Sequence, residues 1–195
     1  FQEALLCEVE EAISRILEET AGLDMIIVAG TPLKVEGGLY NCGVVMHRGR
    51  IAGIAVKSYL PNYREFYEAR QFRPARELPA DVIDLCSQTG IPIGPDLLFR
   101  VSSMPGFTLF VEICEDVFSP VPPSSRAALA GATVVANLSA SNITAGKDEY
   151  RHLLAASQSA RCLCAYIYTA AGFGESTTDL AWDGHAIVYE NGNLV

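Results

Sequence analysis

Cys114 is the side chain in this sequence whose setting most favours nucleophilic chemistry. Every second residue from Phe107 to Ile113 is apolar, the period of two expected of a strand, and Glu115 and Asp116 then interrupt the apolar run. Pro122-Pro123 follows and leads into an Ala/Leu-rich segment, which predicts the start of a helix. A cysteine on such a strand-to-helix turn lies where backbone N–H groups converge and a helix dipole favours an anion, so thiolate is favoured over thiol.

Cys114 alone does not establish chemistry, because most cysteines of this kind are small buried hydrophobes and two carboxylates flank this one. A second candidate group begins at Lys57, which ends the expected strand Gly53–Val56. Glu65 and Glu68 follow it within a cluster of aromatic residues. A strand-end lysine is usually a solvated charge. A thiolate nucleophile, an ammonium group for the oxyanion and a carboxylate for the proton are nevertheless the groups that attack on an amide requires.

Composition limits the class of protein. The 195 residues suffice for one domain, with 50% hydrophobic residues and a net charge of -9, so nucleic acid and anionic membrane surfaces are not expected partners. No apolar run reaches membrane-spanning length and no secretory signal is found, so we expect no membrane association. The three histidines stand far apart in sequence, and the cysteines show neither disulfide nor zinc spacing. We therefore expect reduced thiols, no metal site and a cytoplasmic protein.

The elements that must position these residues are read from periodicity and turn signals. Residues 3–20 predict an amphipathic helix, 25–29 a strand covered on both faces, and 40–47 with 51–57 a hairpin. We expect one helical turn within 58–72, a loop with a short helix near 81–87, and short strands at 133–136, 165–168 and 185–189. The helix expected over 148–161 has Leu153, Ala156 and Ala160 on one side, with Cys164. Asn191-Gly192 is a strong hairpin signal.

Three stretches resemble the nitrilase, or carbon–nitrogen hydrolase, superfamily. They are Y-N-C-G-V-V with G-R-I-A-G-I-A-V-K-S-Y-L-P, V-E-I-C-E-D, and A-N-L-S-A-S. Within that superfamily the chain is most similar to the glutaminase domains of glutamine-dependent NAD+ synthetases. That similarity rests on K-S-Y-L-P-N-Y-R-E-F-Y-E-A-R-Q-F, E-I-C-E-D-V-F-S-P-V-P-P-S and G-E-S-T-T-D-L-A-W-D-G. The resemblance implies a four-layer α-β-β-α sandwich, a Glu-Lys-Cys triad and hydrolysis of glutamine through a cysteine thioester.

The resemblance also implies roles for individual residues. Cys114 matches the nucleophile and Lys57 the triad lysine, while Glu68, or alternatively Glu65, matches an additional glutamate near the lysine. Expected glutamine contacts are Tyr63, Glu115, Phe118, Ser141 and Lys147, the last standing where the family holds an arginine. No metal or cofactor is implied for this domain. ATP and magnesium belong to a synthetase domain that would receive the ammonia and amidate nicotinic acid adenine dinucleotide, and a homo-oligomer is expected.

Two departures from the family pattern shape the expectation for this chain. The triad glutamate lies upstream of the first helix in the family and has no counterpart here, and the S-G-G-x-D signature of the synthetase domain is absent. We therefore expect residues 1–195 to be one glutaminase domain truncated at both ends and inactive alone. The alternatives are another amidase or carbamoylase of the superfamily, or a catalytically dead fragment that retains only fold and assembly surfaces.

Overall fold

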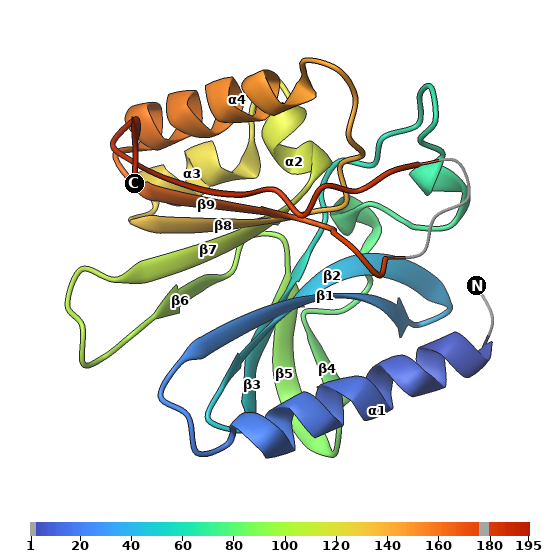
Figure 1. Cartoon of the computed structure of the whole chain (residues 1–195). Coiled ribbons are helices and arrows are strands. Elements are labelled where there is room, and N and C mark those ends of the chain that lie inside the picture. The colour runs from blue at the N-terminus through green and yellow to red at the C-terminus, as the bar shows by residue number, and fades with distance from the viewer. Residues whose placement is uncertain (1–2, 176–179) are drawn as a thin grey trace. The chain divides into compact units, whose positions relative to one another are not determined.

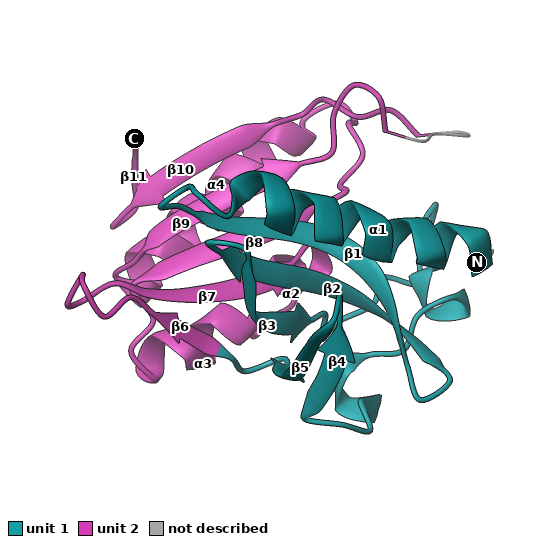
Figure 2. Cartoon of the chain, turned by 90° about the horizontal axis from the view of Figure 1, so that it is seen from below, with its two compact units in different colours: residues 1–97 teal, residues 98–195 magenta. Residues whose placement is uncertain are grey.

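The computed structural model describes residues 3–175 and 180–195. The chain divides into two compact units, unit 1 (Phe1–Leu97) and unit 2 (Leu98–Val195), which Figure 2 distinguishes by colour. Of the G-E-S-T-T-D-L-A-W-D-G motif, residues 176–179 lie outside the described residues. No helix in the described ranges is long and apolar enough to cross a membrane.

Unit 1 is a five-stranded sheet with one long helix packed against it (Figure 1). Ile13 and Leu17 are the helix residues buried in its core, as the expected amphipathic pattern requires. The strand order is β1-β2-β3-β5-β4, with only the β3–β5 pairing parallel. The elements are α1 (Glu3–Thr20), β1 (Ile26–Val35), β2 (Gly38–His47), β3 (Arg50–Val56), the 3₁₀ turns η1 (Glu68–Arg70) and η2 (Ala75–Glu77), β4 (Val82–Leu85) and β5 (Gln88–Gly94).

Two expectations for unit 1 are wrong. The first strand is not a short strand buried on both faces, because β1 spans ten residues at an edge of the sheet and Ile26–Ala29 are only half-buried. The short helix expected near 81–87 is the hairpin β4–β5 instead. Cys86 and Ser87 both have positive φ (49° and 59°), the backbone shape of a two-residue hairpin turn, and Ile83 pairs with Ile91 across the hairpin.

Unit 2 is a six-stranded sheet of order β11-β10-β9-β8-β7-β6 with helices on one face (Figure 1). Strands β7, β8 and β9 are parallel, so their carboxyl ends meet at one edge of the sheet, where α/β proteins place their sites. All six residues of β7 are buried. The elements are β6 (Leu98–Arg100), β7 (Thr108–Ile113), α2 (Glu115–Phe118), α3 (Pro123–Leu129), β8 (Val134–Ser139), α4 (Lys147–Cys162), β9 (Ala165–Ala170), β10 (Ala186–Glu190) and β11 (Asn193–Leu194).

Helix α4 buries a more polar face than expected. Leu153, predicted on its apolar side, is 63% exposed, whereas Arg151, Gln158 and Ser159 are buried together with Ala155. These polar side chains have partners: Gln158 Nε2 donates to Ser124 Oγ at 2.9 Å, and Ser159 Oγ donates to the carbonyl of Cys164 at 2.7 Å. Burial of polar groups is tolerated where hydrogen bonds replace those lost to water.

Candidate functional site

Cys114 lies directly after β7, so the expected end of the strand is confirmed, as is the helix expected after Pro122, which is α3. Cys114 also caps α2, a four-residue helix that was not predicted. Its backbone has φ 49° and ψ −103°, a conformation that non-glycine residues rarely adopt and that costs about 1–3 kcal/mol. The residue is half-buried. Such strain persists only where the surroundings fix the backbone, and it is typical of functional residues.

Hydrogen bonds hold this turn on both sides of Cys114. The backbone N–H of Ile113 donates to Asp116 Oδ2 at 2.9 Å. The carbonyl of Cys114 accepts from the Val117 N–H at 3.2 Å and from Asn137 Nδ2 at 3.5 Å. Asn137 Oδ1 in turn accepts from Ser139 Oγ at 2.7 Å. Asp116 and Asn137 are both buried, so the turn is anchored to the core of unit 2.

Glu112, two residues before Cys114, is a buried carboxylate with structural partners. It accepts from the hydroxyl of Tyr166 at 2.5 Å and from the backbone N–H of Ser124 at 3.0 Å, which ties β7 to β9 and to the start of α3. Burial raises the pKa of Glu112, and hydrogen bonds from Tyr166, Ser124 and Asn137 offset part of that rise. Both oxygens are occupied, so Glu112 is poorly suited to carry a proton for the reaction.

The remaining candidates of unit 2 follow the carboxyl ends of β7 and β8. Glu115 and Phe118 begin and end α2, and the Phe118 ring lies 5.8 Å from that of Tyr150 on α4. Lys147, the first residue of α4, donates through Nζ to Asn142 Oδ1 at 2.6 Å. Ser141 is buried, and its hydroxyl has no hydrogen-bond partner within the described residues. The structure thus brings the unit 2 candidates to one edge of the sheet.

Arg151 and Asp183 are structural groups at this edge that the sequence did not reveal. Arg151 is buried, and its guanidinium donates to Asp183 Oδ2 at 2.5 Å and to the carbonyls of Ser141 and Asn142 at 2.7 and 3.1 Å. Burial would raise the pKa of Asp183, but hydrogen bonds from Arg151 and the His185 N–H lower it below its usual value. An isolated arginine in a helix carries no sequence signal for burial, because its partners come from distant loops.

In unit 1 the structure pairs Lys57 with Glu68. Lys57 lies just beyond β3 and is 2% exposed, and its Nζ is 2.5 Å from Glu68 Oε2. The other oxygen, Glu68 Oε1, accepts from Asn41 Nδ2 at 2.6 Å. Lys57 is therefore not a solvated charge. Glu65, the alternative carboxylate, is half-buried. The ion pair favours Glu68 as the glutamate that accompanies the lysine.

Tyr63 lies in the connecting segment between Lys57 and Glu68. It is 49% exposed, and its ring meets the edge of Phe66 at a centroid distance of 6.1 Å. Its role in holding glutamine stays a prediction, as do the roles of the other candidate residues.

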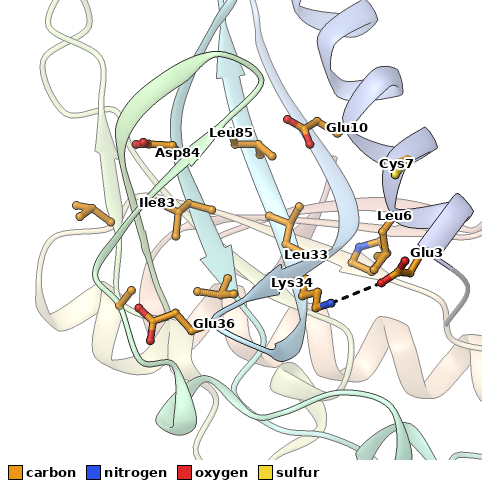
Figure 3. A pocket seen from close by; sticks show the side chains of 14 residues that line it. Glu3, Leu6, Cys7, Glu10, Leu33, Lys34, Glu36, Ile83, Asp84 and Leu85 are labelled. Atoms are coloured by element: carbon orange, nitrogen blue, oxygen red, sulfur yellow. Dashed lines mark ion pairs between the residues drawn. The ribbon is translucent and has the colours of Figure 1, made fainter.

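Unit 1 also carries an open hollow of about 710 Å³ between α1, β1 and β4 (Figure 3). Its lining is mixed, with apolar residues such as Leu33 and Ile83 and carboxylates including Glu3, whose partner is Lys34 at 3.9 Å. None of the candidate catalytic residues lines it. The hollow is therefore separate from the candidate catalytic residues.

The histidines do not form a metal site within the described chain. His152 and His185, far apart in sequence, have ring centroids 5.1 Å apart, and His152 Nδ1 lies 2.8 Å from the Tyr189 hydroxyl. No group of three or more His, Cys, Asp or Glu side chains in residues 3–175 and 180–195 could hold a metal ion.

The cysteines give a first testable prediction. All six are free thiols, and burial raises the pKa of Cys42 and Cys162 and raises that of Cys164 to about 12. A thiol with that last value is ionised in roughly one molecule in 10⁴ at pH 8, so it reacts slowly. We expect competitive alkylation near neutral pH, read by peptide mass spectrometry, to label Cys114 first. Faster labelling of Cys42 or Cys86 would contradict Cys114 as the nucleophile.

The comparison with known families decides the assignment. The profile of the family described as Carbon-nitrogen hydrolase matches residues 1–195. The chain belongs to the carbon–nitrogen hydrolase family. Its sequence is 54% identical over 194 residues to the glutamine-dependent NAD(+) synthetase of Mycobacterium tuberculosis, covering 100% of this chain and 28% of the relative. The enzyme of that name from Aquifex aeolicus is 31% identical over 187 residues, with 96% and 29% covered.

Solved structures agree with the fold of the family. A glutamine-dependent NAD(+) synthetase from Cytophaga hutchinsonii is 28% identical, with a TM-score of 0.77 over 96% of this chain and 30% of that one. A carbon-nitrogen hydrolase from Helicobacter pylori shares the fold at 19% identity, with a TM-score of 0.74 over 98% of this chain and 64% of that one. The expected nitrilase-type α/β fold with two sheets is confirmed. The chain spans under a third of the length of the synthetases it resembles.

Proposed function

We propose that this carbon–nitrogen hydrolase chain is the glutamine-hydrolysing part of a glutamine-dependent NAD+ synthetase. The observation that carries the proposal is the 54% identity over 194 residues to synthetases of that name, together with a strained cysteine at the carboxyl end of β7. The overall reaction converts glutamine and water into glutamate and ammonia. The ammonia serves a synthetase domain of the same full-length chain. The glutamine-hydrolysing domain itself uses no metal or cofactor.

Cys114 is the nucleophile in this proposal. Its sulfur forms a bond to the carboxamide carbon, and the negative oxygen that results accepts a hydrogen bond from the backbone N–H of Glu115. The triad glutamate that the family resemblance implies takes the thiol proton and passes it to the departing nitrogen, so collapse of this intermediate breaks the C–N bond and releases ammonia. Water then hydrolyses the remaining thioester to glutamate and restores the thiol. The strain of the turn favours the proposal because a rarely adopted backbone conformation that the surroundings hold in place is typical of functional residues.

Lys57 supplies positive charge to the oxygen of the substrate amide, and Glu68 fixes the position of its ammonium group. The substrate contacts proposed are Tyr63, Glu115, Phe118, Ser141 and Lys147. Glu115 suits the ammonium of an amino acid, and Lys147 and Ser141 suit its carboxylate. Association into a homo-oligomer is part of the same proposal.

A substrate panel tests the proposed specificity. Ammonia release should be measured for the full gene product that carries this sequence, with glutamine, asparagine, propionamide and an N-carbamoyl amino acid as substrates. We expect hydrolysis of glutamine at a kcat/KM that exceeds the others at least about 10²-fold, because several polar groups of the amino acid are recognised. Preference for a simple amide or a carbamoyl compound would assign the chain to another branch of the family. No hydrolysis of any substrate would favour a role in assembly alone.

The expectation that residues 1–195 alone are inactive remains a prediction. Three carboxylates among or near the candidate residues have other partners: buried Glu112 binds Tyr166 and Ser124, buried Asp116 binds the Ile113 N–H, and half-buried Glu68 binds Lys57. Loss of a positioned acid–base group lowers the rate roughly 10²–10⁴-fold. We expect residues 1–195 to release ammonia at least that much more slowly than the full gene product. Equal activity in both would mean that a carboxylate of this chain carries the proton.

A further inference from the structure

Tyr168 has a buried hydroxyl without a hydrogen-bond partner among the described residues. The residue belongs to β9 and is 2% exposed. Ser141 Oγ and Arg151 Nε are the other two such atoms in the described part of the chain, and all three belong to unit 2. Leaving a buried polar group unpaired costs about 1–3 kcal/mol, so a cluster of them indicates a partner that binds from outside.

The contacts around Tyr168 place it beside the candidate nucleophile. In the sheet it pairs with Asn137 of β8, whose side chain donates to the carbonyl of Cys114 at 3.5 Å. On its other side the guanidinium carbon of Arg151 lies 5.9 Å from the Tyr168 ring centroid, and the same guanidinium donates to the Ser141 carbonyl at 2.7 Å. Tyr168 is therefore linked through Asn137 to the turn of Cys114 and through Arg151 to the loop that carries Ser141.

Tyr166, two residues earlier on β9, shows what a structural tyrosine of this sheet does. It is also buried, but its hydroxyl donates to Glu112 at 2.5 Å. Buried tyrosines normally find such a partner. Two tyrosines that share a strand and a face of the sheet thus differ in one respect. Tyr166 donates a short hydrogen bond to Glu112, whereas Tyr168 makes no regular hydrogen bond within the described residues, although the hydroxyls of Ser139 and Ser141 lie near its phenol.

The missing partner must accept a hydrogen bond. Burial raises the pKa of Tyr168 and the Cys114 charge adds to the rise. The hydroxyls of Ser139 and Ser141, which interact with the phenol without making a regular hydrogen bond to it, and the charge of Arg151 oppose the rise. The phenol therefore stays protonated near neutral pH. Ser141 Oγ can also donate, and the nearby Arg151 carries positive charge. A carboxylate suits this set because its two oxygens accept several hydrogen bonds. If the carboxamide of glutamine reacts at Cys114, the carboxylate at its other end is the group available for Tyr168.

We propose that Tyr168 is a substrate-binding residue whose hydroxyl donates a hydrogen bond to the carboxylate of the bound amino-acid substrate. This inference rests on the proposed function as a glutamine amidohydrolase. It adds to the expected pocket a residue that no sequence motif marked, and it explains why the protein keeps a polar group buried without a partner of its own.

The proposed contact between Tyr168 and the substrate carboxylate is tested by a matched pair of variants, Tyr168→Phe and Tyr166→Phe, introduced into the full gene product. Tyr168→Phe removes an unpaired hydroxyl, so the melting temperature should rise by about 2 °C or more, whereas Tyr166→Phe should lower it. Glutamine binding is read as protection of Cys114 from iodoacetamide. Tyr168→Phe should raise the half-protecting glutamine concentration roughly 10-fold or more, because a hydrogen bond to a charged group is lost. Tyr166→Phe should change it far less.

Two analogues identify the end of the substrate that Tyr168 contacts. Glutaramate keeps the carboxylate and lacks the amine, whereas 4-aminobutanamide keeps the amine and lacks the carboxylate. Tyr168→Phe should weaken protection by glutamine and glutaramate by the same factor and leave protection by 4-aminobutanamide unchanged. Equal weakening of all three would overturn the contact with the carboxylate.

Three other results would overturn the inference. A fall in the melting temperature of Tyr168→Phe would mean that its hydroxyl has a partner inside the protein. Unchanged protection by glutamine in this variant would mean that the hydroxyl does not reach the substrate, while the proposed function would stand because the wild type is still protected. Failure of glutamine to protect the wild type would overturn the proposed function and this inference together.

Discussion

Cys114→Ala should abolish glutamine hydrolysis by the full gene product, lowering ammonia release by about 10⁴-fold or more. The expected loss is this large because the thioester cannot form without the sulfur, and removal of a nucleophile disables the whole catalytic unit. The measurement is ammonia release at saturating glutamine. Mass spectrometry after treatment with a diazoketone analogue of glutamine should place the covalent adduct on Cys114 in the wild type and find none in the variant.

Cys7→Ala is the matched control for this variant. Cys7 is an exposed thiol on α1, in unit 1, so its loss should leave both the activity and the melting temperature unchanged. Activity of Cys114→Ala within about 10-fold of the wild type would exclude Cys114 as the nucleophile. An adduct on another cysteine would identify the nucleophile directly.

Lys57→Met should reduce both stability and activity. The Lys57–Glu68 pair is nearly inaccessible to solvent, with side chains 3% and 14% exposed, so loss of the lysine leaves a carboxylate buried without its counter-ion. Breaking a buried pair in this way costs about 3–5 kcal/mol of stability. The activity should fall roughly 10²–10³-fold, the usual effect of removing a group that stabilises an oxyanion.

The double variant Lys57→Met/Glu68→Gln separates the two effects. A glutamine at position 68 removes the uncompensated charge and can still accept from Asn41 Nδ2, so urea unfolding should show most of the lost stability restored. Ammonia release should stay low, because the ammonium is still absent. Recovery of activity together with stability would show that Lys57 is a structural residue only.

Some of this protein could be predicted from the sequence because the determining interactions are local. The amphipathic period of α1, the turns around the β2–β3 hairpin and the Asn191-Gly192 turn each act over a few residues, and the structure confirms all three. The strand-to-helix turn at Cys114 was predicted in the same way, since Glu115 and Asp116 end an apolar run. The nitrilase-type fold was predicted from the resemblance of the motifs to those of the family.

Other features required the tertiary structure. A short segment such as Val82–Leu85 has no periodicity that separates strand from helix, and its pairing with β5 decided for strand. The face that α4 buries was mispredicted because its polar residues find partners in distant segments, such as Ser124 for Gln158 and Asp183 for Arg151. These hydrogen bonds offset the free-energy cost of burying polar groups. Such partners are set by the fold and leave no local pattern.

The candidate site divides along the same line. The sequence alone identified Cys114 and Lys57 as candidates, because residue type and position at the end of a strand can be read from the sequence. The sequence preferred Glu68 to Glu65 on its motif setting, and the structure supplied the contact, an ion pair of 2.5 Å between Glu68 and Lys57. Only the structure distinguished Tyr168 from Tyr166, because whether a hydroxyl finds an acceptor depends on Glu112, 54 positions away from Tyr166 and brought beside it by the sheet.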